Sequence, residues 1–275
     1  MALYVNTNIS SLNAQRNLNT SESALATSLQ RLSSGMRVNS AKDDAAGLAI
    51  ASGMSAQIRG SNQAMRNAND AISMAQTAEG VLGQIESNVQ RMRELAVQGA
   101  NGTSTTANRV QMKLELDQLS NENKRLIKGS TFNGQTLMST ATAKVFTFHV
   151  GAGTTANDSI KMTIAAANFS LAATTSVTFT TQANASAAIG KFDTDLKTLG
   201  DMRAQLGAAQ NRFSAVVTNL QTFTENTSAA KSRIMDTDFA TESATLTRNQ
   251  IIQQAGTAML SQANQLPQAA LSLLK

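Results

Sequence analysis

The sequence predicts a mainly α-helical protein: a long antiparallel helical bundle or coiled coil with a small β-hairpin region, in which the N- and C-terminal helices pair. Apolar residues recur at helical spacing over long stretches, and the 275 residues include a single Pro. Only 4% of the chain is aromatic although 41% is hydrophobic, so Ala, Leu, Ile, Val and Met build most of the core. In one central stretch, apolar and polar residues alternate with period two, which indicates β-strands.

The N-terminal segment predicts the first helix. Its narrow apolar stripe ends at Ser33, Ser34 and Gly35, a typical helix C-terminus. The members of the stripe are Ile9, Leu12, Leu18, Leu25, Leu29 and Leu32. Asp43 and Asp44 then offer two carboxylates for acid–base chemistry, but adjacent residues point in different directions on a helix. Acids at the positive end of a helix dipole are the better interpretation, and they predict that the second helix starts here.

Two further apolar stripes predict a pair of central helices. The longer one comprises Met65, Ala68, Ile72, Ala75, Leu82, Ile85, Val89, Met92 and Ala96, and the shorter one Met112, Leu116, Leu119 and Leu126. Gly99, Asn101 and Gly102 lie between the two stripes and predict a turn. The shorter helix therefore folds back antiparallel to the longer one.

The stretch from about 131 to 182 predicts a small β region. A turn at 131–134 is followed by Val145–Val150 and Ile160–Ile164, which alternate around a loop and predict a hairpin; Val177–Thr180 predicts another strand. Within the loop, Gly151, Gly153 and Ala156 match the spacing of a dinucleotide-binding loop. Because that loop leads into a strand and not a helix, a hairpin turn is the favoured interpretation.

A heptad repeat predicts the longest helix. One row of the repeat comprises Phe192, Leu199, Leu206, Phe213, Leu220, Thr227 and Ile234, and a second row, three residues later, comprises Asp195, Met202, Ala209, Val216, Phe223 and Ala230. Thr227 and Asp195 are the weak position of each row. The helix spans about 65 Å, which favours a rod over a compact globule.

The C-terminal segment predicts a last helix with another narrow stripe: Ile252, Ala255, Met259, Ala263, Leu266, Ala270 and Leu273. This helix can pair with the first one, but the two stripes bury too little apolar area to offset the ordering entropy. We therefore expect both ends to be poorly ordered in the free monomer and to fold when many copies pack. The predicted domains are a terminal coiled-coil domain, 1–42 with 236–275, and a bundle with the hairpin, 43–235.

Composition and charge argue against enzymatic chemistry. The chain has no Cys and one histidine, His149, so we expect no catalytic, metal or cofactor site. The net charge of +5 indicates a basic solvated surface rather than a nucleic-acid partner, because Lys and Arg form no run. We expect neither a secretory signal nor a membrane span. Missing Cys fits both a cytosolic protein and one exported unfolded.

Several motifs, in order, identify the chain as similar to one family. Near the N-terminus these are Val5-Asn6-Thr7-Asn8-Ile9, Leu32-Ser33-Ser34-Gly35, the stretch 39–50 and Arg93-Glu94-Leu95-Ala96-Val97-Gln98; near the C-terminus they are Leu206-Gly207-Ala208, Gln210-Asn211-Arg212, Ser232-Arg233-Ile234 with Asp236 and Asp238, and Gln254-Ala255-Gly256 through Ala263-Asn264-Gln265. With these motifs the chain closely resembles bacterial flagellin, everywhere except about 140–185.

The resemblance implies a structural function, that of a homopolymer forming the extracellular flagellar filament. Terminal helices pair in the filament core, and the outer domains of longer flagellins would sit in an insert that is too short here, which implies a thin, smooth filament. Implied partners are other copies, a flagellar export chaperone holding 236–275 before type III export, and cap and hook-associated proteins. The candidate polymerisation residues are Leu18, Leu25, Leu29, Leu32, Ile252, Met259, Leu266 and Leu273. A hook–filament junction protein of the same fold is the alternative; a metalloprotease insert is disfavoured because His-Glu-x-x-His is missing.

A second implication concerns Arg91, Arg93 and Glu94, which flank the longer central stripe. By themselves they indicate either a solvated helix flank with local ion pairs or a contact surface for another protein. Flagellins detected by Toll-like receptor 5 present an Arg, a Leu and a downstream Glu. In this sequence these correspond to Arg91, Leu95 and Glu115, so the resemblance favours the contact surface.

Overall fold

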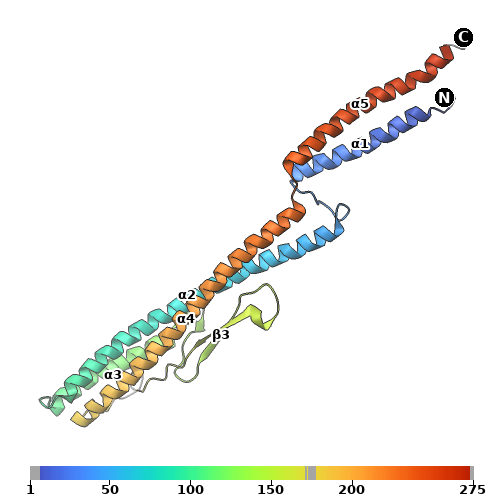
Figure 1. Ribbon diagram of the computed structural model, residues 1–275. Coiled ribbons are helices and arrows are strands. Elements are labelled where there is room, and N and C mark those ends of the chain that lie inside the picture. Colours follow the sequence, from blue (N-terminus) through green and yellow to red (C-terminus); the bar gives the residue numbers. More distant parts are fainter. Residues whose placement is uncertain (1–6, 171, 173–177, 273–275) are drawn as a thin grey trace. The chain divides into compact units, whose positions relative to one another are not determined.

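The computed structural model describes residues 7–170, 172 and 178–272, with 266–272 as backbone only (Figure 1). Its helices are α1 (Ile9–Ser34), α2 (Ala45–Ala100), α3 (Thr106–Gly129), α4 (Gln182–Met235) and α5 (Phe239–Ser272), and its strands are β1 (Thr131–Phe132), β2 (Gln135–Thr136), β3 (Lys144–His149) and β4 (Ser159–Ile164). Most described residues are helical, and the predicted fold class is confirmed.

The chain forms two compact units, one made of the residues up to 56 with those from 226 onward, and the other made of 57–225. In the first unit α1 packs along α5 (Figure 1). The second unit holds α3, the β strands, and most of α2 and α4. The predicted domain division, 1–42 with 236–275 against 43–235, stays a prediction.

Local signals explain where the helices begin and end. Asn8 caps α1, and Gly35, at φ 71°, ends it with an N–H bond to the Arg31 carbonyl. The Asp44 carboxylate accepts the Gly47 N–H at 2.8 Å at the start of α2, as predicted for a helix-starting acid. Asp43 lies one residue before the capping position, and its carboxylate closes the turn at 39–43 instead.

The core of the unit 57–225 follows the predicted helix stripes. The heptad residues Phe192, Leu199, Leu206 and Phe213 are buried, and the α2 residues that share this core include Ala68, Ala75, Leu82, Ile85, Val89, Met92 and Ala96. The ring of Phe213 packs edge-to-face on Phe148 of β3, with 5.5 Å between centroids. The hairpin is thus held against α4 by an aromatic pair.

The predicted hairpin is confirmed, and a smaller one precedes it. β3 pairs antiparallel with β4 in a register that runs from Lys144 opposite Ile164 to His149 opposite Ser159. β1 and β2 are joined by Asn133 and Gly134, both at positive φ, which a two-residue hairpin loop of this kind requires.

The predicted strand Val177–Thr180 is wrong. Residues 178–180 belong to no strand, and Val177 lies outside the described residues. Phe179 is buried, and a side chain at Gly99 would overlap its ring. This segment is therefore held by an aromatic anchor over the end of α2 and not by a strand ladder.

Candidate subunit interface

The helices α1 and α5 run antiparallel, as three contacts along the pair show. Leu18 lies against Gly256, Arg31 lies 3.7 Å from Glu242, and Asn8 bonds to the Ala263 carbonyl. Between these points the less exposed residues recur at steps of three and four, the spacing of a coiled coil. We call them the terminal seam: Ser11, Ala14, Leu18, Ser21, Leu25, Ser28 and Leu32 on α1, and Glu242, Leu246, Asn249, Gln253, Gly256, Leu260 and Ala263 on α5.

The terminal seam is made mostly of small and polar side chains. Its leucines are only half-buried, and two of its buried members, Ser11 and Ser28, carry hydroxyl groups. The Nδ2 group of Asn249 is buried there with no partner. Such a seam contributes little apolar burial, so the helix pair by itself is weakly stabilised.

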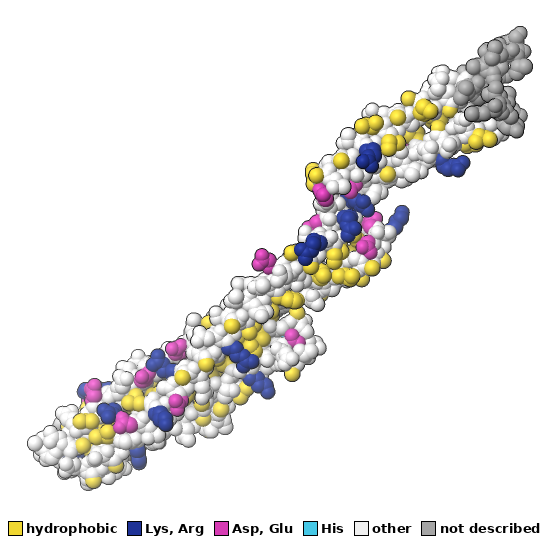
Figure 2. All heavy atoms as spheres, viewed as in Figure 1, with side chains coloured by type: hydrophobic (Ala, Val, Ile, Leu, Met, Phe, Trp, Pro, Cys, Tyr) yellow, Lys and Arg dark blue, Asp and Glu magenta, His cyan; other side chains and the backbone are white. Residues whose placement is uncertain are grey.

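Large apolar side chains instead point out of the pair. Those on α1 are Ile9, Leu12 and Leu29, and those on α5 are Phe239, Ile251, Ile252 and Met259. Met259 is 65% exposed. Figure 2 shows hydrophobic side chains at the surface of this helix pair. We call these seven residues the exposed face; large apolar side chains left uncovered in one chain are typical of an interface with another protein.

The candidate polymerisation residues therefore fall into two groups. Leu18, Leu25 and Leu32 lie in the terminal seam, whereas Leu29, Ile252 and Met259 lie on the exposed face. Leu266 is on α5 with its side chain undescribed, and Leu273 lies outside the described residues.

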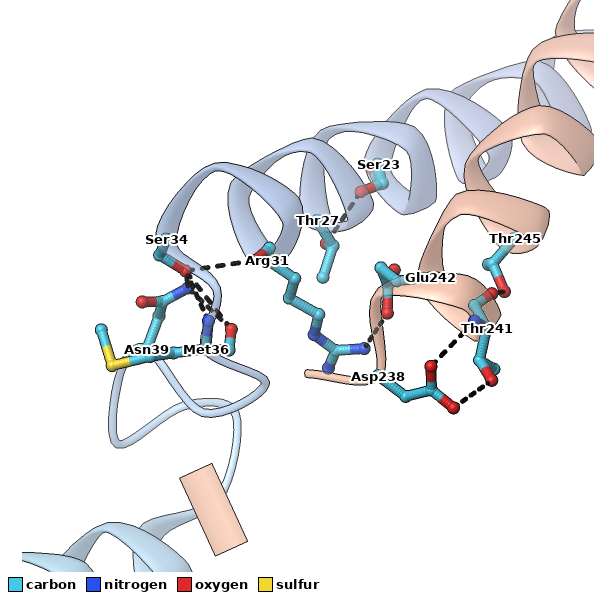
Figure 3. A network of polar contacts seen from close by, with 10 residues as sticks. All are labelled: Ser23, Thr27, Arg31, Ser34, Met36, Asn39, Asp238, Thr241, Glu242 and Thr245. Carbon is cyan, nitrogen blue, oxygen red and sulfur yellow. Dashed lines mark hydrogen bonds and ion pairs between the residues drawn. The ribbon is translucent and has the colours of Figure 1, made fainter. Parts of the chain in front are cut away.

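The connectors 35–38 and 235–237 follow and precede the terminal helices, and they are bonded to each other. Figure 3 shows polar contacts beside them: Arg31 of α1 pairs with Glu242 of α5, and Asp238 accepts bonds from Thr241. Met36 and Asp236 form an antiparallel bridge, and the Thr237 N–H donates to the Gly35 carbonyl at 3.0 Å. The Arg37 side chain donates to the Ile234 carbonyl at 2.7 Å. Both ends of the terminal pair thus leave from one short hydrogen-bonded junction.

Two carboxylates at this junction are held ionised. The backbone N–H and hydroxyl of Ser40 lower the pKa of Asp43, and the hydroxyl and N–H of Thr241, with the Ala240 N–H, lower the pKa of Asp238 at the start of α5. Because each pKa is lower in the folded chain than in the unfolded one, ionisation of these carboxylates stabilises the fold above about pH 4. This stabilisation is lost as pH falls through the folded-state pKa. We therefore expect acidification to weaken the turn at 39–43 and the start of α5.

The three receptor-contact candidates meet in the unit 57–225. Arg91 on α2 pairs with Glu115 on α3 at 2.9 Å and with Glu94 at 3.1 Å. The side chains of Arg91, Glu94 and Glu115 are all exposed. The hydrogen bond to Glu115, followed by that to Glu94, raises the pKa of Arg91, so the guanidinium stays charged. Leu95 is buried, with 3% exposed, and lines the same open pocket together with Arg91 and Glu115.

Sequence reasoning missed a set of ion pairs between α2 and α4. Arg93 pairs with Asp193 at 2.6 Å, and Arg203 pairs with both Glu86 and Glu79. It also missed why Asp195 occupies a heptad position: its carboxylate is buried and accepts the N–H groups of Ser170 and Ala172. A charged residue inside an apolar repeat was the available signal.

Within the described ranges, no three His, Cys, Asp or Glu side chains are placed to hold a metal ion. The helices in the same ranges all fall short of the length and hydropathy that a membrane span needs.

Comparisons with known proteins cover nearly the whole chain. A family described as the bacterial flagellin N-terminal helical region matches residues 5–143, and the bacterial flagellin C-terminal helical region matches 189–274. A flagellin of Halalkalibacterium halodurans is 42% identical, over 99% of this chain and 100% of that protein. The flagellar filament 33 kDa core protein of Treponema phagedenis is 39% identical over the same shares. A crystal structure of Bacillus cereus flagellin is 28% identical, with a TM-score of 0.48 over 56% of this chain and 88% of that one.

Proposed function

The chain belongs to the bacterial flagellin family, and on that premise we propose how it builds a filament. It is a structural, non-enzymatic subunit of the extracellular flagellar filament. We propose that α1 and α5 are its polymerising part. The matched relative of nearly equal length supports a further proposal, that the subunit has no outer domains and forms a thin, smooth filament.

The observation that carries this proposal is the distribution of apolar side chains around α1 and α5. The terminal seam holds small and polar residues, while the exposed face holds Leu29, Ile252 and Met259 among others. Burying one such side chain contributes about 1.5–3 kcal/mol. Copies that stack along this face gain the apolar burial that the isolated pair lacks, so assembly and ordering of the ends are coupled.

Seeded elongation tests the proposal. Short filament fragments are mixed with the purified full chain or with a chain lacking 236–275, and growth is followed by electron microscopy. We expect the full chain to extend the seeds and the shortened chain to leave their length unchanged. Equal growth of the two chains would show that the terminal pair is not the polymerising part.

Before assembly the exposed apolar side chains of α1 and α5 have no other copy to pack on. We propose that a flagellar export chaperone holds 236–275, which includes the exposed Phe239, Ile252 and Met259, until the chain is exported. Cap and hook-associated proteins are the proposed neighbours at the filament ends, where the terminal pair of the last subunit has no further copy to pack on.

We also propose Toll-like receptor 5 as a partner of the monomer. The support is the exposed Arg91–Glu115 pair, which bridges α2 and α3 at the rim of an open pocket. Leu95 lines the same pocket but is buried, so in this proposal it supports the surface and does not supply much contact area itself. Arginine held by ion pairs on a rigid helix is a common anchor of protein interfaces.

Arg91→Ala is expected to weaken receptor signalling by the monomer by at least about tenfold, because truncating an anchoring arginine commonly costs that much. The measurement is a reporter-cell dose response. Arg125→Ala is the matched control, since Arg125 is also exposed and ion-paired, with Glu122 on the outer part of α3. Equal dose responses for the two variants would remove Arg91 from the proposed contact.

A further inference from the structure

The single proline of the chain lies inside α5. Pro267 has no backbone N–H, and α5 continues through it from Phe239 to Ser272. In an α-helix the N–H of residue 267 would donate to the carbonyl of Ala263, so that carbonyl is left without its helical partner. In the body of an ideal α-helix the other carbonyls each accept the N–H four residues on.

The freed carbonyl is taken by the first residue of the terminal pair. The Asn8 Nδ2 donates to the Ala263 oxygen at 2.8 Å, while the Asn8 Oδ1 accepts the Ser11 N–H at 3.0 Å and caps α1. The amide orientation is unambiguous, because a carbonyl only accepts and a backbone N–H only donates. Asn8 therefore satisfies one unpaired group on each helix at once.

A second bond lies beside the first. The hydroxyl of the buried Ser11 donates to the Asn264 Oδ1 at 2.8 Å. Ala263 itself is a buried member of the terminal seam. The polar contact is therefore partly shielded from water, where a hydrogen bond matters more than at an open surface.

We propose that Asn8 and the carbonyl freed by Pro267 form a register lock between α1 and α5. Most seam residues are small or polar, and the α1 leucines Leu18, Leu25 and Leu32 repeat every seven residues, so a shift of one heptad changes the packing of the seam little. A shift that brings Asn8 opposite Gly256 meets a carbonyl already bonded within the helix. Asn8 then loses its acceptor, and the Ala263 carbonyl stays unpaired in the seam.

The lock has a consequence for assembly, which rests on the proposed polymerising face. Ile9 follows Asn8 directly, and Met259 lies one turn before Ala263. The register therefore decides which exposed apolar side chains of α1 stand beside those of α5, and hence the surface that each copy offers to its neighbours. Asn8 and Pro267 act as positioning residues for polymerisation.

The test compares two single variants and their double variant. Each is made in the full-length chain and measured both in solution and in seeded filaments. Asn8→Ser keeps an N-cap but removes the donor, and Pro267→Ala restores the N–H that pairs with Ala263. Register is read with cysteine pairs and a short thiol cross-linker, unambiguous because the chain has no other Cys. Leu18→Cys with Gly256→Cys reports the observed register, and Leu18→Cys with Asn249→Cys reports the register shifted by one heptad.

We expect Asn8→Ser to lower the ratio of observed to shifted cross-link about fivefold, the factor of one typical net hydrogen bond. Pro267→Ala should lower it similarly although alanine is the better helix former, and the double variant should fall no further. The proposal is overturned if Pro267→Ala raises the ratio, if the two effects multiply, or if neither changes it. Failure of the unmodified chain to extend seeds would overturn the proposed function instead. The ratio in soluble chain would still decide on the lock, because the cross-linker traps α1 and α5 whenever they pair, even if the pair forms only transiently.

Discussion

Met259→Asp is expected to impair filament elongation strongly while leaving the free chain unchanged. Met259 is 65% exposed on α5, so in one chain the carboxylate stays in water and costs little. In the proposed filament the same position is covered by another copy. There the substitution removes apolar burial and forces a charge into the interface, a combined cost of several kcal/mol for each subunit.

The measurement is the critical concentration for seeded growth, followed by light scattering and checked by electron microscopy. We expect a rise of at least about 100-fold for Met259→Asp, which corresponds to a loss of about 2.7 kcal/mol. Met259→Leu is the matched control, because it conserves volume and hydrophobicity, and it should grow close to the unmodified chain. Growth of Met259→Asp at the unmodified concentration would contradict the assignment of this face.

Phe213→Ala is expected to lower the free energy of unfolding of the unit 57–225 by about 3–5 kcal/mol. Phe213 is 0% exposed and lies between the α2 core and the hairpin, where its ring meets Phe148. Removing it leaves a cavity and unties β3 from α4. Denaturant unfolding followed by circular dichroism gives the free energy directly.

Phe223→Ala provides the comparison within the same helix. Phe223 is 41% exposed, so its truncation should cost no more than about 1 kcal/mol. Similar losses for the two variants would mean that the heptad row is not the stabilising core of this unit. The contrast also separates the core of the bundle from the part of α4 that continues towards the junction.

The helices were predictable because their signals are local. Gly35 ends α1 in a left-handed conformation, and Asp44 caps α2, from side chains within a turn or two of the helix end. The hairpin of β3 and β4 was predictable for the same reason, since alternation and a turn-rich loop define it within about 20 residues. The predicted strand Val177–Thr180 failed because Phe179 is held by Gly99, far away in the sequence.

The candidate surface was predictable only in part. Periodicity placed Leu18, Leu29 and Met259 on apolar stripes, but it could not separate seam from exposed face, because both occupy neighbouring angles on a narrow helix stripe. The partners of a side chain on another helix depend on the register of that helix. Leu18 is assigned to the seam because it contacts Gly256. Met259 is assigned to the exposed face because its side chain is largely uncovered within one chain.

The sequence by itself determined the helical periods, the hairpin, the helix ends and the membership of the flagellin family, because each is encoded in residues close together in the chain. Tertiary structure alone decided the antiparallel register of α1 and α5, the buried role of Asp195, the burial of Leu95 and the pairing of Arg91 with Glu115. Tertiary structure also decided the role that we propose for Pro267. A proline frees a carbonyl wherever it enters a helix, but only the folded chain brings Asn8 to that carbonyl.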